Sequence, residues 1–522
     1  MKRVVSLILA IMMVLPCLSF IGCKKEQSDV TILRICNCED YIDEDLLLEF
    51  EEQNPDIDIV YSTYGTNENL YNELVINPNS YDLVVPSEYM IQKLAAEGRL
   101  KKLDLSQVPN YVDNVSPYIK DRLDGIEFTV EDGEYKGQTT QLSQFMVGYM
   151  WGTMGWVYNT DLVSIDEVSS WTGVYNNPDL NKKITLKDSV RDTYLVGLAM
   201  AYQDDLKNAQ NNQEITAILN RTEDKDIEAV GNAIKAVKNK LYGFEVDSGK
   251  NDIVLGNIYA YVAWSGDAAY AIDVAAGEVE DEDGSTVQNT KTLSYSIPKE
   301  GSNIWFDGFV MPAASTNDEA AYRFLNFISN PENVYRNMDY TGYTSMVAGD
   351  VIYNDIVIDW FDESEYYLQD AGYDLDALTE TEIEVILAGV TETDLNEYGY
   401  QTVDLSYFFG GSASDYSVIV HEESYGRLMA QYPDKDAVDR CAIMNYFNDD
   451  QLVRINKMWE SVKSPTFPMW VINLIFILVI LLAVFVVLYR HKDKIKWFKL
   501  PSKKLDYATK HDLKVVKKVE ID

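Results

Sequence analysis

The chain has 522 residues and a formal net charge of −40, with 84 acidic residues against 44 basic ones. A field of that sign repels nucleic acid, so no nucleic-acid partner is expected, and the charge suits either a cationic ligand or simple solubility. Five cysteines are too few for a disulfide framework. With only three histidines, a histidine-based metal site or catalytic triad is not expected.

Residues 1–22 have the features of an export signal. Lys2 and Arg3 precede an apolar stretch that leads into Ile21-Gly22-Cys23. A basic start, a short apolar run and a small residue before the cleavage point are typical of a secretory signal. The small residue directly before a cysteine resembles the bacterial lipobox, in which Cys23 would be lipidated, although Phe20 stands where leucine is usual. The alternative is an ordinary signal with an incidental cysteine.

Residues 468–489 are predicted to form a transmembrane helix. They include no charged residue and are long enough to cross a hydrocarbon core of roughly 30 Å. The tail, 490–522, has 11 Lys/Arg and 5 Asp/Glu, and this basic excess predicts a cytoplasmic location. We therefore expect a cell-membrane protein whose main part, residues 24–467, lies on the outer face and carries a net charge of about −48.

The exterior part is expected to form two lobes, because its length exceeds what one hydrophobic core usually supports. Its first segment alternates strands and helices, which indicates βαβ units and a parallel sheet. Strands are predicted at 31–36, 57–62 and 81–85, and helices at 43–52 (capped by Asp43), 67–75 and 88–97.

Polar side chains directly follow the third of these strands. Pro86 ends the strand because it has no N–H to give, and Ser87, Glu88 and Tyr89 come next. In open α/β sheets, ligands bind at the carboxyl ends of the strands. We expect Ser87 both to cap the following helix and to face a cleft.

The later elements indicate that the chain enters a second lobe and then returns. They are a hairpin at 127–136, strands at 146–158, 257–264 and 303–311, helices at 190–208, 213–220, 226–240 and 317–329, and a surface loop at 278–289. The predicted division is lobe 1 at 24–145 and 303–350, and lobe 2 at 146–302 and 351–463. The second part of lobe 2 includes an acidic, tyrosine-rich insertion, 351–439, with helical patches and two strands around a Gly-Gly turn.

Several motifs in order resemble one family. They are YSTYGTNENLYNEL (61–74), YDLVVPSEYMIQKLAAEGRLKKLD (81–104), MWGTMGWVYN (150–159), LKDSVRD (186–192), YVAWSGDAAYA (261–271), IWFDGFVMP (304–312) and TGYTS (341–345). These segments closely resemble the spermidine/putrescine-binding proteins of ABC importers. The resemblance implies an α/β, type II periplasmic-binding-protein fold, with two lobes hinged by crossover strands around a cleft.

The same resemblance implies a non-enzymatic capture protein without a cofactor. It would deliver a polyamine, putrescine or spermidine, to an ABC permease powered by separate ATPase subunits. No P-loop motif occurs in the sequence, so ATP would be handled by those partners.

The binding residues implied by the resemblance are of two kinds. A buried ammonium needs carboxylate acceptors, and it also gains energy over aromatic faces. Tyr41, Ser87, Tyr89, Trp264, Trp305 and Tyr343 would supply walls and hydroxyls, and Asp192 and Asp307 would supply negative charge; no metal ligands are predicted. The two tryptophans could instead be core residues, and Arg191 could form a structural ion pair with Asp192.

Two positions depart from the family pattern. Cys38 lies where the spermidine binder has a cleft tryptophan, and Ser189 lies where it has a further acid. The sequence therefore supports putrescine and spermidine equally.

Two other functions are compatible with parts of the sequence. A membrane-tethered amine sensor could use the same module, but the 33-residue tail is too short for a kinase or cyclase domain. An exported hydrolase would need a nucleophile elbow or a zinc motif, and neither occurs.

Overall fold

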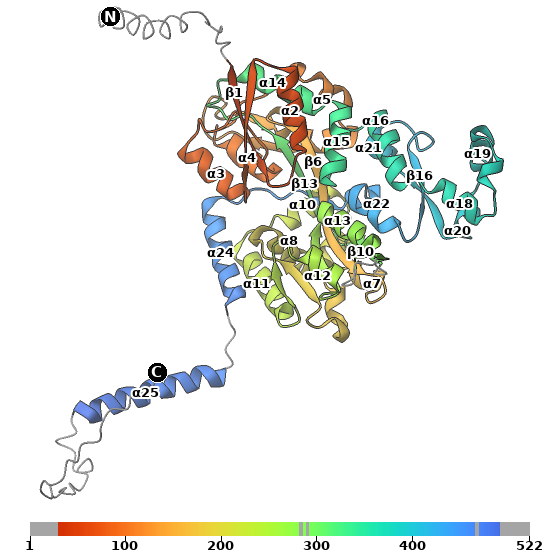
Figure 1. The fold of residues 1–522 in the computed structure, drawn as a ribbon. Helices are drawn as coiled ribbons and strands as arrows, with labels where there is room; N and C mark the ends of the chain where they lie inside the picture. The colour runs from red at the N-terminus through yellow and green to blue at the C-terminus, as the bar shows by residue number, and fades with distance from the viewer. Residues whose placement is uncertain (1–29, 281–285, 289–291, 465–468, 491–522) are drawn as a thin grey trace, which may run out of the picture. The chain divides into compact units, whose positions relative to one another are not determined.

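The computed structural model describes residues 30–280, 286–288, 292–464 and 469–490 (Figure 1). The chain divides into a unit that ends at Val462 and a second unit that begins at Lys463, and each is described by itself. The predicted signal with Cys23, and the predicted tail beyond Arg490, lie outside the described residues.

A parallel three-stranded sheet is built from the first part of the chain, in the order β2-β1-β3. The strands are β1 (Thr31–Cys38), β2 (Ile57–Tyr64) and β3 (Leu83–Val84), and the helices are α2 (Glu44–Gln53), α3 (Asn67–Ile76) and α4 (Glu88–Ala96). The predicted βαβ arrangement is confirmed. Asp43 caps α2 as expected, because its side chain accepts a hydrogen bond from the N–H of Asp45 at 3.0 Å.

An eight-stranded mixed sheet forms the rest of the core. Its order is β17-β13-β6-β9-β7-β8, and β12 and β14 also pair with β6. The strands are β6 (Val147–Asn159), β7 (Ile184–Lys187), β8 (Gly243–Glu245), β9 (Ala260–Trp264), β12 (Leu293–Ser296), β13 (Ser302–Phe309), β14 (Thr344–Ser345) and β17 (Cys441–Ala442). Every residue of β6 is buried, as expected for a strand covered on both faces.

Helices pack around the two sheets (Figure 1). They include α5 (Pro109–Asn114), α6 (Pro117–Asp124), α8 (Val190–Ala201), α9 (Gln203–Asn208), α10 (Asn212–Leu219), α11 (Asp224–Lys238), α12 (Gly249–Leu255), α13 (Ser265–Ala276), α14 (Asp318–Ile328), α15 (Pro331–Thr341), α22 (Tyr425–Gln431) and α24 (Asp449–Lys463).

Three predictions of local structure are corrected. The predicted helix 190–208 is broken at Tyr202, whose backbone leaves the helical region and whose hydroxyl donates to Asp226. The hairpin is longer than predicted, because β4 (Glu127–Thr129) pairs with β5 (Thr139–Gln141) across a loop with two left-handed glycines, Gly133 and Gly137. The predicted loop at 278–289 contains a short antiparallel pair, β10 (Glu278–Glu280) and β11 (Thr286–Gln288).

Strand β13 connects the two sheets. Its first residues pair with β17 and β6, whereas a bridge from Asp307 to Ser87, and one from Val310 just beyond its end to Val84, join this segment to the first sheet. The register with β6 shifts between Asp307 and Gly308, and such a bulge re-aims the adjacent side chain. Asp307 therefore lies where the chain passes from one sheet to the other.

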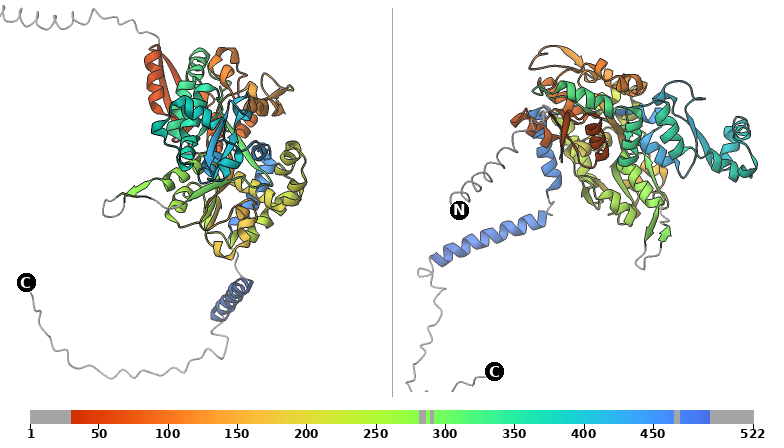
Figure 2. Two further views of the ribbon diagram at one scale, coloured as in Figure 1. Left: turned by 90° about the vertical axis from the view of Figure 1, so that its right-hand side faces the viewer. Right: turned by 45° about the horizontal axis from the view of Figure 1, so that its top comes forward.

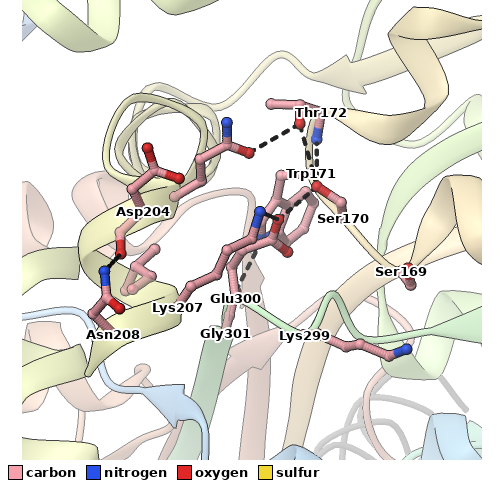
Figure 3. Close-up of polar contacts among 12 residues, drawn as sticks. Ser169, Ser170, Trp171, Thr172, Asp204, Lys207, Asn208, Lys299, Glu300 and Gly301 are labelled. Atoms are coloured by element: carbon pink, nitrogen blue, oxygen red, sulfur yellow. Dashed lines mark hydrogen bonds and ion pairs between the residues drawn. The ribbon is translucent and has the colours of Figure 1, made fainter. Parts of the chain in front are cut away.

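Polar contacts around the buried Glu300 carboxylate lie at the segment that leads into β13 (Figure 3). The Glu300 carboxylate accepts a hydrogen bond from the Ser170 hydroxyl at 2.5 Å, and Lys207 Nζ lies 4.0 Å from the same oxygen. The indole N–H of Trp171 donates to the carbonyl of Gly301 at 2.8 Å. These contacts hold the segment that leads into β13.

The middle of the insertion 351–439 forms an arm that projects from the body of the first unit (Figures 1 and 2), whereas its two ends join the main core through residues such as Ile352 and Leu428. It includes α18 (Ser364–Asp370), α19 (Glu380–Leu387), α20 (Glu392–Asn396) and the antiparallel pair β15 (Tyr400–Asp404) and β16 (Ser417–His421). A separate small core lies inside the arm, formed by Tyr367, Leu368, Leu395 and Tyr400. The helical patches and the strand pair were predicted, but the short helix α21 (Ser406–Phe409) before the Gly-Gly turn was not.

The second unit contains helix α25 (Met469–Arg490). Its segment Asn473–Arg490 is long and apolar enough to cross a membrane, with a mean hydropathy of 2.6, and none of it is buried.

Candidate functional site

The Asp307 carboxylate is buried and only partly satisfied. The Tyr41 hydroxyl donates to Oδ2 at 2.8 Å, and the Ser87 hydroxyl lies near enough to favour the charged form of the carboxyl group. Oδ1 has no hydrogen-bond partner among the described residues. Burial raises the pKa of Asp307 to about 6, with the two hydroxyls opposing the shift and no cation contributing to it. Asp307 is therefore a buried acid with no positive partner among the residues that the structure describes.

Aromatic rings enclose this carboxylate. Tyr343, in the turn between α15 and β14, meets Tyr41 edge to face at 5.1 Å and Trp305 at 5.9 Å between ring centroids. The Trp305 indole nitrogen is buried without a hydrogen-bond partner in the described part of the chain. Five of the predicted residues, Tyr41, Ser87, Trp305, Asp307 and Tyr343, thus meet in one cluster, which we call the Asp307 cluster.

Two glycines make room for these rings. A Cβ at Gly152 of β6 would lie 2.5 Å from a ring carbon of Trp305, and a Cβ at Gly266 of α13 would lie 2.3 Å from two ring carbons of Tyr343. Both distances are shorter than any ordinary contact. The sequence reasoning did not single out these glycines, although Gly266 stands inside the WSGD motif.

Gly266→Ala is expected to displace the Tyr343 ring and to destabilise the protein by about 1–3 kcal/mol, the usual cost of overpacking. Thermal melts of the variant measure the loss of stability. The displaced Tyr343 ring should also weaken the binding of any solute at the Asp307 cluster. Gly243→Ala is the matched control, because a Cβ there meets nothing within 4 Å. Equal melting temperatures of the two variants would contradict this account of Gly266.

Trp264 and Asp192 belong to a second group, arranged around Lys187. The Lys187 ammonium lies 4.3 Å from the ring centroid of Trp264, at the end of β9. Asp192, in the first turn of α8, is buried, and burial raises its pKa against hydrogen bonds from Ser189 and Trp264. Asp267 of α13 also belongs to this second group, because it lies 3.7 Å from the Lys187 ammonium. The Tyr343 hydroxyl of the Asp307 cluster donates to Asp267 at 3.4 Å, and this hydrogen bond links the two groups.

Tyr89 lies apart from the Asp307 cluster. Its ring stacks against the Arg191 guanidinium at 3.7 Å, and its hydroxyl donates to Glu68 at 3.1 Å. Arg191 donates to the backbone carbonyl of Asn445, and no Arg191–Asp192 ion pair occurs among the described residues. The alternative of an ion pair that consumes Asp192 is therefore wrong.

The expectation that the Ser87 side chain caps α4 is also wrong. Ser87 occupies the N-cap position, but its side chain makes no capping hydrogen bond. Its hydroxyl accepts from the Asn67 amide at 3.0 Å, and the Asn67 carbonyl oxygen accepts from the Ser87 N–H. Asn67, which the sequence reasoning missed, therefore turns the hydroxyl toward Asp307.

Glu88 is a third buried acid in this region. One oxygen accepts from the Phe306 N–H at 3.1 Å, and the other has no partner among the described residues. Burial raises the pKa of Glu88 to about 8, so the group is largely protonated at neutral pH.

The two departures from the family pattern lie beside these carboxylates. Ser189 caps α8 by accepting from the Asp192 N–H at 3.3 Å. Burial raises the pKa of the Cys38 thiol to about 12, and the charge of Asp307 adds to the shift. Cys36, Cys38 and Cys441 are free thiols. In the described ranges no group of three or more His, Cys, Asp or Glu side chains is placed to hold a metal ion.

Comparison with known proteins identifies the family. The profile of the bacterial extracellular solute-binding proteins matches residues 45–350, more than half of the chain. The chain belongs to this family. Because these are binding components rather than enzymes, the prediction of a non-enzymatic, extracytoplasmic solute-binding protein is confirmed.

Individual relatives are distant. This solute-binding protein is similar to the spermidine/putrescine-binding periplasmic protein of Salmonella typhimurium, at 25% identity over 317 residues, which are 60% of this chain and 78% of that protein. It is also similar to the putrescine-binding periplasmic protein PotF of Escherichia coli, at 28% identity over 322 residues, 60% of this chain and 77% of that one.

A solved structure confirms the α/β periplasmic-binding-protein fold. The spermidine/putrescine ABC transporter substrate-binding protein PotD of Streptococcus pneumoniae superposes with a TM-score of 0.52. The match covers 83% of this solute-binding protein and 98% of that chain, at 22% sequence identity.

Proposed function

We propose that this solute-binding protein captures a polyamine outside the cytoplasm and delivers it to an ABC permease powered by separate ATPase subunits. The observation that carries the proposal is the Asp307 carboxylate, which is buried, has no cationic partner within the part of the chain that the structure describes, and is enclosed by Tyr41, Trp305 and Tyr343. An ammonium ion supplies the missing charge and hydrogen bonds, and the rings receive the aliphatic methylenes. The spermidine- and putrescine-binding relatives support this solute class.

The fold suits capture by closure. In the proposed arrangement, residues 24–145 and 303–350 form one lobe, residues 146–302 and 351–463 form the other, and β6 and β13 cross between them as the hinges of a type II fold. The proposed binding residues then come from both sides, with Ser87 and Tyr41 from the first lobe and Trp264 and Asp192 from the second.

Ligand-linked stability tests the solute class. A ligand that binds only the folded state raises the free energy of unfolding by roughly 2.7 kcal/mol at 100 times its dissociation constant. Melts of the purified full-length chain in detergent are therefore expected to shift upward with putrescine or spermidine and to stay unchanged with maltose or glutamate. A shift with the sugar and none with either amine would overturn the proposal.

We further propose that α25 anchors the protein in the cell membrane, in addition to a lipid on Cys23. One acyl chain gives only marginal, reversible binding, whereas an apolar helix of this length inserts stably. The Cys23→Ala variant is expected to remain in the membrane fraction. Recovery of this variant in the medium at full length would contradict the anchoring role of α25.

A further inference from the structure

Lys187 places an ammonium group of the chain itself beside the proposed site. It is the last residue of β7, and its side chain is only 1% exposed. Its Nζ lies over the Trp264 ring, 4.3 Å from the centroid. Trp264 was predicted to form a wall of the solute site, and the chain already places a positive group of its own over that ring.

Two acids and a carbonyl hold this ammonium. Nζ lies 3.6 Å from Glu245 and 3.7 Å from Asp267, and it donates to the carbonyl of Val246 at 3.0 Å. Asp267 also lies 3.9 Å from Lys250. A buried ammonium needs such partners to offset the loss of hydration, so the charge of Asp267 is already paired within the chain.

The other buried acids near the aromatic rings are not paired with a lysine as Asp267 is. Neither Asp307 nor Asp192 is in an ion pair of 4.0 Å or less within the described residues, although Lys187 and Arg191 act on Asp192 at longer range. Glu88 is buried beside Asp307 but largely protonated at neutral pH. Asp307 and Asp192 are therefore buried acids outside any ion pair among the described residues, whereas Asp267 and Glu245 both lie beside the Lys187 ammonium.

We propose that Lys187 acts as a built-in ammonium that fills one cationic position of the site, so that the preferred solute is a diamine rather than a triamine. This inference rests on the proposed function and specifies its solute. In this proposal, Asp307 and Asp192 receive the two ammonium groups of a diamine. The third ammonium of a triamine would have to share the Trp264 ring with Lys187, and like charges in a buried site repel strongly.

Calorimetric titration of the full-length chain in detergent with putrescine and with spermidine tests the inference. The unmodified protein is expected to bind putrescine at least tenfold more tightly than spermidine. Lys187→Met keeps the apolar stem and removes the charge, so it should raise the affinity for spermidine relative to putrescine by tenfold or more. Lys187→Gln keeps a hydrogen-bond donor for the Val246 carbonyl. It is the variant to titrate if Lys187→Met does not fold.

Lys250→Met is the matched control. Lys250 also approaches Asp267, but it lies over Tyr270 rather than Trp264, so its removal should leave the putrescine-to-spermidine ratio unchanged. Equal or tighter binding of spermidine by the unmodified protein, or an unchanged ratio in a folded Lys187 variant, would overturn the role of Lys187. Binding of neither amine would instead overturn the proposed function itself.

Discussion

Asp307→Asn is expected to lower the affinity for putrescine by roughly ten- to a hundredfold. A hydrogen bond to a charged group in a dry site is worth about 1.5–3 kcal/mol, and each 1.4 kcal/mol is about tenfold in affinity. Asparagine keeps the shape and one acceptor for the Tyr41 hydroxyl, so the loss reports on the charge. Titration calorimetry of the full-length variant measures it.

The same substitution is expected to leave the ligand-free protein more stable, by about 1–3 kcal/mol at pH 7. Burial raises the pKa of Asp307 to about 6, so ionisation at neutral pH costs the folded state free energy that an amide does not. Asp376→Asn, on the exposed surface of the arm, is the matched control and should change neither quantity. Unchanged putrescine affinity in a well-folded Asp307→Asn protein would make Asp307 a structural residue.

Binding of the amine is expected to weaken by about tenfold between pH 7.5 and pH 5. The solute keeps its positive charge in this range, whereas the Asp307 carboxyl, with a pKa of about 6, becomes mostly protonated. Calorimetric titrations at half-unit steps of pH measure the effect. An affinity that does not vary with pH would contradict the assignment of Asp307 as the counter-ion.

The stability of the ligand-free protein should respond to pH in the opposite direction. The folded-state pKa values of Asp307 and Glu88 lie above their unfolded values, so the folded state binds more protons. The free energy of unfolding should therefore rise as the pH falls from about 8 toward 5. A double variant, Asp307→Asn with Glu88→Gln, should flatten this part of the profile, and a wild-type profile equally flat would argue against both shifts.

Much of the Asp307 cluster could be predicted because its residues stand at recognisable positions of short motifs. Asp307 was informative by itself, since an acid inside an otherwise apolar strand needs a partner. Ser87 was informative because it follows a strand at the end where ligands bind. Neither inference required knowledge of how distant segments meet.

The residues that were not predicted owe their roles to contacts between segments that lie far apart in the sequence. Lys187 ends a short strand and looks like an exposed lysine in sequence. Its ammonium is buried only because β7 lies beside β9, whose Trp264 covers it, and because α13 brings Asp267 to it. Asn67 likewise resembles any first-turn polar residue, and its role exists only through Ser87, 20 positions later.

The position of Asp307 on β13 has a mechanical consequence. When two bodies turn about a common axis, each atom travels a distance proportional to its separation from that axis. If the lobes open about the segments of β6 and β13 that pass between the sheets, Asp307 lies almost on the pivot, whereas groups on the outer loops swing through wide arcs. A solute could then meet its principal counter-ion in the open form, at nearly the geometry it keeps after closure, and the remaining contacts would assemble around a charge that has scarcely moved.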